Sequence, residues 1–117
     1  MATMDEVLST LVDVAGANGA MVVGRDGLML SQTGVIGEDV DSIAALASNA
    51  LRSPENLSEQ LSSGALMQVL LQYERGIVAV EPLSEEYVLV MAMGENANIG
   101  MVRYALKKHK AKLVDAL

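Results

Sequence analysis

The stretch MVVGRDGLML, residues 21–30, is the most specific local signal for the fold, because two apolar runs flank a tight-turn signal. Glycine relieves the positive backbone φ that a tight hairpin turn requires, so Asp26-Gly27 favours a β-hairpin. We predict one strand over residues 20–23 and a returning strand over residues 28–30. Several folds, sensory domains among them, contain such a hairpin, so the neighbouring segments have to identify this one.

An amphipathic helix precedes the hairpin. Thr3 and Glu6 have the spacing of a capping box, in which a hydroxyl and a carboxylate satisfy free backbone N–H groups at a helix start. Gly16 and Gly19 then end the helix. Between these signals, the residues that recur at helical spacing predict its apolar face: Val7, Leu8, Leu11, Val12 and Ala15.

A second helix follows the hairpin and begins near Glu38, Asp39 and Asp41, whose carboxylates suit the positive end of the helix dipole. Its apolar stripe consists of Val40, Ile43, Ala44, Ala47, Ala50 and Leu51. The opposite face is small and weakly charged, which is unusual for a solvated helix. That face consists of Ser42, Ala45, Asn49 and Arg52. Ser53-Pro54 resembles a cap followed by proline at the first helical position, so we predict a kink or restart there and a continuation to Gly64.

Three strands complete the predicted sheet. The third, residues 66–73, carries no charge on either face, so we expect both faces to be covered. One face carries Met67, Val69, Leu71 and Tyr73, and the other carries Leu66, Gln68, Leu70 and Gln72. Residues 77–81 and 87–93 form the last two strands, and Asn96 caps a closing helix. That helix makes apolar contacts through Ile99, Val102, Leu106, Leu113 and Leu117.

The order of these elements is αββαβββα. It predicts an α+β fold with a five-stranded antiparallel sheet and helices on both faces. A chain of 117 residues suffices for one such domain, over residues 1–117, and not for two. Hydrophobic residues make up 51% of it, which is high for so small a body. We therefore expect part of the apolar surface to lie between subunits.

The composition excludes several classes of function. The net charge of −7 argues against nucleic acid as the main partner and against anionic membrane surfaces. The chain has no cysteine, hence no disulfide framework and no thiolate metal site. No apolar run approaches the ~20 residues of a membrane span. We expect a soluble cytoplasmic protein.

No catalytic or cofactor site emerges from the remaining motifs. His109, the one histidine, lies in a basic stretch with Arg103 and Lys112, which we interpret as a solvated helix face in preference to a docking patch. One histidine without cysteine offers neither a metal site nor a serine-type triad. Residues 34–37 match no phosphate-binding glycine motif. We interpret Arg25 as a polar turn residue. We therefore expect no enzyme activity, no cofactor and no metal.

Three features together resemble the roadblock/dynein light chain family, in its prokaryotic, MglB-like branch. They are the hairpin segment over residues 19–30, the helix from Glu38 with Ile43-Ala44-Ala45-Leu46-Ala47, and a late segment. The late segment joins Val80-Glu81-Pro82-Leu83, residues 87–93 and Asn98-Ile99-Gly100. The resemblance covers essentially the whole chain, and the order of the motifs carries it.

The resemblance implies a homodimer or heterodimer in which the third strands pair into a ten-stranded sheet and the central helices lie side by side. It places Leu66, Gln68, Leu70 and Gln72 in the dimer interface. It also implies a small Ras-like GTPase as partner, bound at Ser42, Ala45, Asn49 and Arg52. Members of this kind activate hydrolysis by reorganising the GTPase's own site, without an arginine finger.

Two alternatives to a GTPase regulator remain open. The first is a structural adaptor, like the dynein light chains, that dimerises and recruits a partner other than a GTPase. The second is a profilin-like or PAS-like sensor of small molecules, since those folds also wrap a five-stranded sheet with helices. A buried ligand cavity would favour the sensor, but the sequence offers few convergent polar groups for one.

Overall fold

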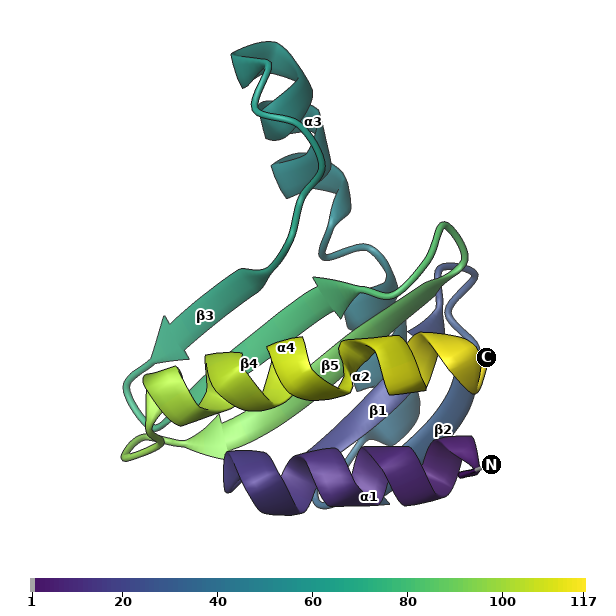
Figure 1. The fold of residues 1–117 in the computed structure, drawn as a ribbon. Helices are drawn as coiled ribbons and strands as arrows, with labels where there is room; N and C mark the ends of the chain where they lie inside the picture. Colours follow the sequence, from purple (N-terminus) through teal and green to yellow (C-terminus); the bar gives the residue numbers. More distant parts are fainter. Residues whose placement is uncertain (1) are drawn as a thin grey trace.

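A five-stranded antiparallel sheet forms the centre of the computed structural model, which describes residues 2–117 and leaves Met1 outside the description (Figure 1). Its spatial order is β2-β1-β5-β4-β3. The strands are β1 (Gly19–Gly24), β2 (Met29–Gly34), β3 (Val69–Tyr73), β4 (Gly76–Pro82) and β5 (Tyr87–Gly94). The predicted α+β class and the five-stranded antiparallel sheet are thus confirmed.

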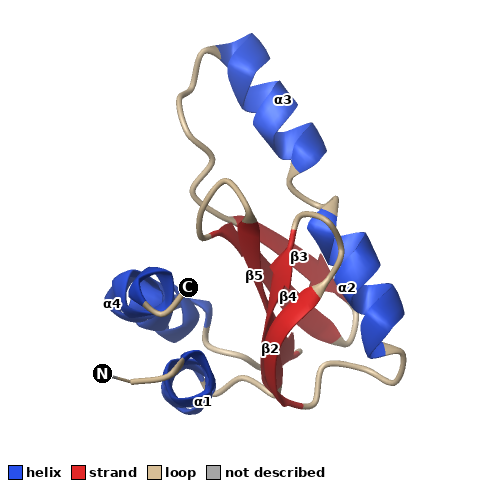
Figure 2. Ribbon diagram, turned by 90° about the vertical axis from the view of Figure 1, so that its right-hand side faces the viewer, coloured by secondary structure: helices blue, strands red, loops and turns tan. Residues whose placement is uncertain are grey.

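Helices lie on both faces of the sheet, as predicted (Figure 2). On one face α1 (Met4–Ala15) packs beside α4 (Ile99–Asp115). On the other face lies α2 (Val40–Ser48), and α3 (Arg52–Leu61) rises away from the sheet. The fold therefore has three layers over most of the sheet, and α3 projects from them.

The N-terminal helix forms as its capping signals predict. The Thr3 hydroxyl accepts a hydrogen bond from the Glu6 backbone N–H at 3.2 Å, and Gly16 ends the helix at a φ of 67°. Glycine adopts this left-handed conformation without the penalty that a Cβ atom causes. The predicted apolar face is confirmed, because all five of its residues are buried.

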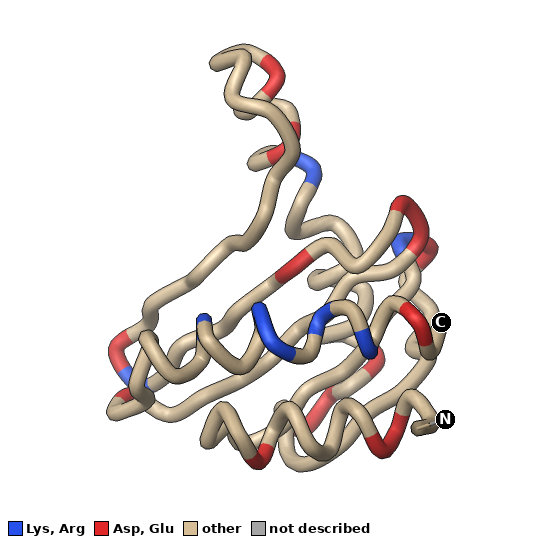
Figure 3. Tube along the Cα trace, viewed as in Figure 1, with Lys and Arg blue, Asp and Glu red and all other residues tan. Residues whose placement is uncertain are grey.

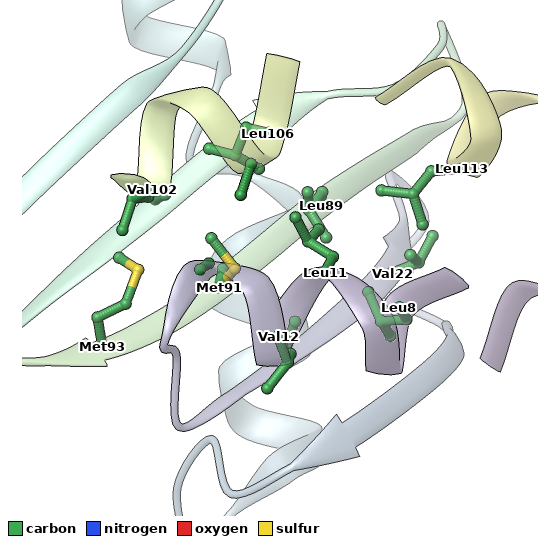
Figure 4. Close-up of a cluster of buried hydrophobic side chains, with 14 of the residues drawn as sticks. Leu8, Leu11, Val12, Val22, Leu89, Met91, Met93, Val102, Leu106 and Leu113 are labelled. Atoms are coloured by element: carbon green, nitrogen blue, oxygen red, sulfur yellow. The ribbon is translucent and has the colours of Figure 1, made fainter. Parts of the chain in front are cut away.

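The larger core cluster lies between the sheet and the α1/α4 pair (Figure 4). Leu8 and Leu11 reach from α1 toward Leu89 and Met91 of the sheet. From α4 come Val102, Leu106 and Leu113, as predicted. Two other predicted contacts of this helix are wrong: Ile99 and Leu117, at or just beyond its ends, are exposed.

The cap of α4 also differs from the prediction. Asn98, and not Asn96, accepts a hydrogen bond through its side chain from the Met101 N–H, at 3.1 Å. An N-cap has to stand directly before the first helical residue, which is Ile99. Residues 95–97 instead complete the turn after β5, where the Ala97 N–H donates to the Gly94 carbonyl.

The second core cluster lies under α2. Asp39 caps this helix by accepting from the Ser42 N–H at 3.1 Å, so the helix begins at Val40 and Glu38 stays outside it. The predicted apolar stripe is confirmed. Ala44, Ala47 and Leu51 are buried, and Val40, Ile43 and Ala50 are partly buried against the same cluster.

The chain breaks after α2 and restarts as α3, which confirms the predicted restart but not its position. Pro54 is the third residue of α3 and not the first, and Leu51 stands at the cap without a capping side chain. Proline is tolerated there because N–H groups of a first turn have no partner within the helix. The helix ends at Leu61 and not at the predicted Gly64. Ser62, the next residue, adopts a φ of 53°.

The hairpin forms at the predicted turn. The Asp26 carboxylate accepts from the Leu28 N–H at 3.0 Å, and Gly27 has a φ of 92°. The returning strand is longer than predicted, because it pairs with β1 as far as Gly34. Hydropathy alone does not mark the polar half of this strand, yet Ser31 is buried and its hydroxyl donates to the Asp5 carboxylate.

Candidate dimer and partner interfaces

The helix α3 has almost no support from the rest of the chain. None of its ten residues is buried, and Leu57 is 59% exposed. Leu61 is exposed as well, although both leucines have the apolar character of core residues. Figure 1 shows α3 standing beyond the edge of the sheet. An amphipathic helix that buries nothing within its own chain presents its apolar side for a contact with another molecule.

The strand β3 continues this open region. It is the terminal strand, so one row of its backbone groups has no neighbouring strand. Val69 packs toward the α2 cluster and Leu70 toward the α1/α4 cluster, whereas Leu71, Gln72 and Tyr73 are exposed. Tyr73 is 59% exposed. The strand carries no charge that would oppose pairing with another strand.

The predicted third strand is wrong at its N-terminal half. Pairing with β4 begins at Val69 opposite Val80, so Leu66 and Gln68 precede the strand. Leu66 packs against the α2 cluster, while Leu70 contacts the opposite one. Of the four residues expected on one face, only Leu70 and Gln72 are in β3. The expected cover is also wrong for the C-terminal half of β3, which nothing within the chain shields.

A bidentate ion pair links α3 to the rest of the fold. The Arg25 Nη1 atom lies 2.7 Å from Glu55 Oε1, and Nη2 lies 3.2 Å from Oε2. This pair joins the β1–β2 turn to the first turn of α3, and both side chains are partly exposed. Arg25 is therefore more than the polar turn residue that we expected. Its guanidinium links α3 to the β1–β2 turn through two charge-assisted hydrogen bonds.

The predicted partner residues lie on the outer side of α2 and just beyond it. Ser42, Ala45 and Asn49 are exposed, with Asn49 at the C-cap, where its amide donates to the Ala45 carbonyl at 3.3 Å. Arg52 is exposed too but begins α3, so the structure does not place it on the same helix. Sequence reasoning missed Leu46, which is 72% exposed on α2. Its position outside the apolar stripe was the available signal.

The interpretation of His109 as part of a solvated face is wrong. It is 4% exposed, and neither ring nitrogen has a partner among residues 2–117. Burial lowers the pKa of His109 below its ordinary 6.5, and the charges of Lys112 and Lys108 act in the same direction. Its spacing from Val102, Leu106 and Leu113 was the signal, because it places His109 on the buried stripe.

Residues 2–117 contain no group of three or more histidine and carboxylate side chains that could hold a metal ion. A hollow of about 360 Å³ beside the Arg25–Glu55 pair is lined mainly by charged and small side chains, among them Glu59, Gly64 and Glu85. None of the helices in this range is long and apolar enough to cross a membrane.

Comparison with known proteins finds one family. Residues 3–92 match the family model described as Roadblock/LC7 domain. The uncharacterized protein MJ1340 of Methanocaldococcus jannaschii is 29% identical over 110 residues, which cover 94% of this chain and 96% of that protein. The match to the family model spans most of the chain and both candidate interfaces.

Solved structures share the fold over almost the full length. MglB of Myxococcus xanthus superposes with a TM-score of 0.87 at 19% identity, covering 96% of this chain and 92% of that one. Gliding protein MglB of Thermus thermophilus gives a TM-score of 0.85 at 23% identity, over 95% of this chain and 85% of that one. At these identities the likeness establishes a common fold.

Proposed function

The chain belongs to the Roadblock/LC7 domain family, and from this membership we propose that it is a non-enzymatic, dimeric regulator or scaffold of a small Ras-like GTPase in the cytoplasm. The observation that carries the proposal is the open arm of α3 and β3, whose apolar side chains find no cover within the chain. A second copy supplies that cover, and the paired α2 helices then form the surface for the GTPase.

The dimer forms through β3. Two β3 strands from two copies pair edge to edge and join both sheets into one of ten strands. The uncharged edge supports this, since charges are a common device against such pairing. Leu71 and Tyr73 then lie next to the other copy, and the exposed Leu57 and Leu61 of α3 are available for contact with it. Leu66, Gln68, Leu70 and Gln72 remain the dimer residues proposed from the sequence.

The GTPase binds the outer side of α2. Ser42, Ala45 and Asn49 allow close approach of a partner backbone, and Leu46 supplies an apolar contact at the centre. Arg52 borders this surface from α3. Regulation proceeds without an arginine finger, as the resemblance to the family implies.

Binding to nucleotide-loaded small GTPases of the source organism tests the proposal. We expect GTP-dependent binding by the wild type, and its loss in Ala45→Arg, which places a long cation on the α2 surface. The matched control is Ala111→Arg, on the exposed side of α4 across the sheet, which should bind normally. A hydrolysis assay on the bound GTPase separates an activator from a scaffold. Binding without changed turnover identifies a scaffold or adaptor, and failure to bind any GTPase in either nucleotide state refutes the GTPase partner.

The dimer is tested separately by Leu71→Asp. A carboxylate at the centre of a strand interface loses hydration without gaining a partner, so dimerisation should weaken strongly. Met29→Asp is the matched control, because Met29 is also exposed but lies in β2, at the opposite edge of the sheet. Sedimentation velocity in about 1 M salt, which screens contacts between surface charges, should show monomers for Leu71→Asp and dimers for Met29→Asp. Dimers in both variants would show that β3 is not the interface.

A further inference from the structure

The two helices that share one face of the sheet carry opposite charge. Every charged residue of α1 is acidic, namely Asp5, Glu6 and Asp13. Between Ile99 and Lys112, every charged residue of α4 is basic. Figure 3 shows the red positions on α1 and the blue positions along α4. The outer face of this layer is therefore divided into an acidic half and a basic half.

These charges form no ion pair with each other. Across residues 2–117 the ion pairs are Arg25–Glu55 and Lys110–Glu81, so no pair joins α1 to α4. Lys110 reaches down to the sheet, whereas Arg103, Lys107, Lys108 and Lys112 stay exposed. The acidic residues of α1 are exposed as well. Both helices thus present charge outward for an external partner.

Apolar side chains stand between the charges and supply contact area. Tyr104 is 57% exposed on α4, with Lys108 Nζ 5.9 Å from the centre of its ring. Met101 and Val114 on α4 and Val14 on α1 are exposed as well. Tyrosine and methionine are frequent anchors of protein interfaces, and flanking charges of both signs form a typical rim.

The division of charge identifies the partner. The two helices run antiparallel, so the N-terminal end of α1 lies by the C-terminal end of α4, around a hollow lined by Ala2, Val7 and Lys112 (Figure 1). A twofold axis that lies in the plane of the contact, parallel to the two helices and midway between them, would place α1 of one copy over α4 of the other and α4 over α1. Such an isologous contact is complementary to itself. An anionic membrane or nucleic acid would be repelled by α1, and a uniformly basic protein would be repelled by α4.

We propose that the outer face of α1 and α4 is a second self-association surface, on which another copy of the chain packs its α4 against α1 and its α1 against α4. This surface lies apart from β3 and α3, so the two contacts can form together and build assemblies larger than a dimer. Exposed ion pairs contribute little each and are screened by salt. The contact is therefore weak, and its strength depends on ionic strength.

The test uses two charge-reversed variants. The first reverses α1 through Glu6→Lys and Asp13→Lys, and the second reverses α4 through Lys107→Glu and Lys108→Glu. All four side chains are exposed, and thermal melts establish that each variant folds. Both are made in the Leu71→Asp background, so that association through β3 does not contribute. Sedimentation velocity compares low salt with about 1 M salt, at which the Debye length falls to about 3 Å.

We expect the Leu71→Asp parent to associate at low salt and to lose this association at high salt. Each reversed variant alone should lose it, because like charges then face each other. An equimolar mixture of the two variants should recover it, since the reversed positions of α1 in one copy then face the reversed positions of α4 in the other with opposite charge. Glu85→Lys with Glu86→Lys, at the exposed β4–β5 turn, makes the same change in net charge as the α1 variant and should leave the association intact.

Absence of recovery in the mixture, or a parent whose sedimentation does not depend on salt, would overturn the proposal. Loss of association in the control variant would overturn it too, because net charge and not this face would then be responsible. If Leu71→Asp leaves the β3 dimer intact, the same comparisons apply to association of that dimer. The test of the α1/α4 surface therefore gives a result whether or not β3 is the dimer interface.

Discussion

The centre of the sheet and its β3 edge differ in how far they are covered by the rest of the chain. At β5 and β1, α1 and α4 cover one face and α2 the other, and nearly every residue of these strands is buried. At β3 the last three residues are exposed, and the neighbouring α3 buries none of its residues. Both regions contain apolar side chains, with valine and leucine among them. The difference teaches that apolar sequence marks a surface to be covered, and that the covering layer can belong to another molecule.

The largest expected effect contrasts Leu106 with Leu57. Leu106→Ala opens a cavity in the α1/α4 core and should lower the free energy of unfolding by about 2–5 kcal/mol. Leu57→Ala removes the same atoms from exposed α3 and should change it by less than about 0.5 kcal/mol in a monomeric Leu71→Asp background. Urea denaturation measures both. Equal losses would mean that α3 is packed against the fold in solution.

A second expected effect concerns the charge buried under α4. Glu81 is buried in the sheet, with Lys110 Nζ 3.3 Å from Oε1. Lys110→Met leaves that carboxylate without its cation and should cost about 1–3 kcal/mol of unfolding free energy. Lys107→Met, which removes an exposed cation, is the control and should have little effect. Adding Glu81→Leu to Lys110→Met should recover most of the loss, and a further loss would contradict the role of the ion pair.

The buried His109 makes the closed side sensitive to acid. Its pKa in the folded chain lies below 6.5, chiefly because it is buried, so the unfolded chain binds the proton first as the pH falls. Stability should therefore decline from about pH 6.5 down to the lowered pKa, and this group contributes no pH dependence above that window. His109→Leu should flatten the profile there. The measurement is the urea midpoint of the wild type and of His109→Leu as a function of pH. Parallel pH profiles of the two proteins would refute the prediction.

The smallest expected effect concerns the Arg25–Glu55 ion pair, which links α3 to the β1–β2 turn. Arg25→Ala removes the ion pair with Glu55 and should cost less than about 1 kcal/mol, because exposed pairs are screened by water and salt. Amide exchange in α3 should nevertheless accelerate, since the helix has no buried contacts to hold it. Arg75→Ala, at the exposed β3–β4 turn, serves as the control. Unchanged exchange in Arg25→Ala would show that the pair does not restrain α3.

Much of the fold could be predicted, because its signals act over a few residues. The Thr3 cap, the Asp26-Gly27 turn and the stripe of α2 depend on neighbours within one or two turns of chain. The start of β3 could not be predicted in this way. It depends on where Val80 of β4 lies, and the apolar character of Leu66 and Met67 extends beyond that point.

The candidate interfaces were predictable in part for the same reason. Exposure of Ser42, Ala45 and Asn49 follows from helical spacing, since they stand opposite the apolar stripe. Arg52 was assigned to the same helix because the break after Ser48 has no strong local signal. The exposure of Leu46 and the burial of His109 follow helical spacing too, because Leu46 lies outside the stripe of α2 and His109 lies on the stripe of Val102, Leu106 and Leu113.

By itself, the sequence determined the order of the elements, the α+β class with its antiparallel sheet, and the family to which the chain belongs. Periodicity and turn chemistry depend on residues close together in the chain, so they can be recognised without knowledge of the fold. Only the tertiary structure decided that α3 leaves the sheet, that β3 begins at Val69, and that α1 and α4 set opposite charges side by side. These features depend on contacts between residues far apart in the chain, and no local sequence pattern predicts such contacts.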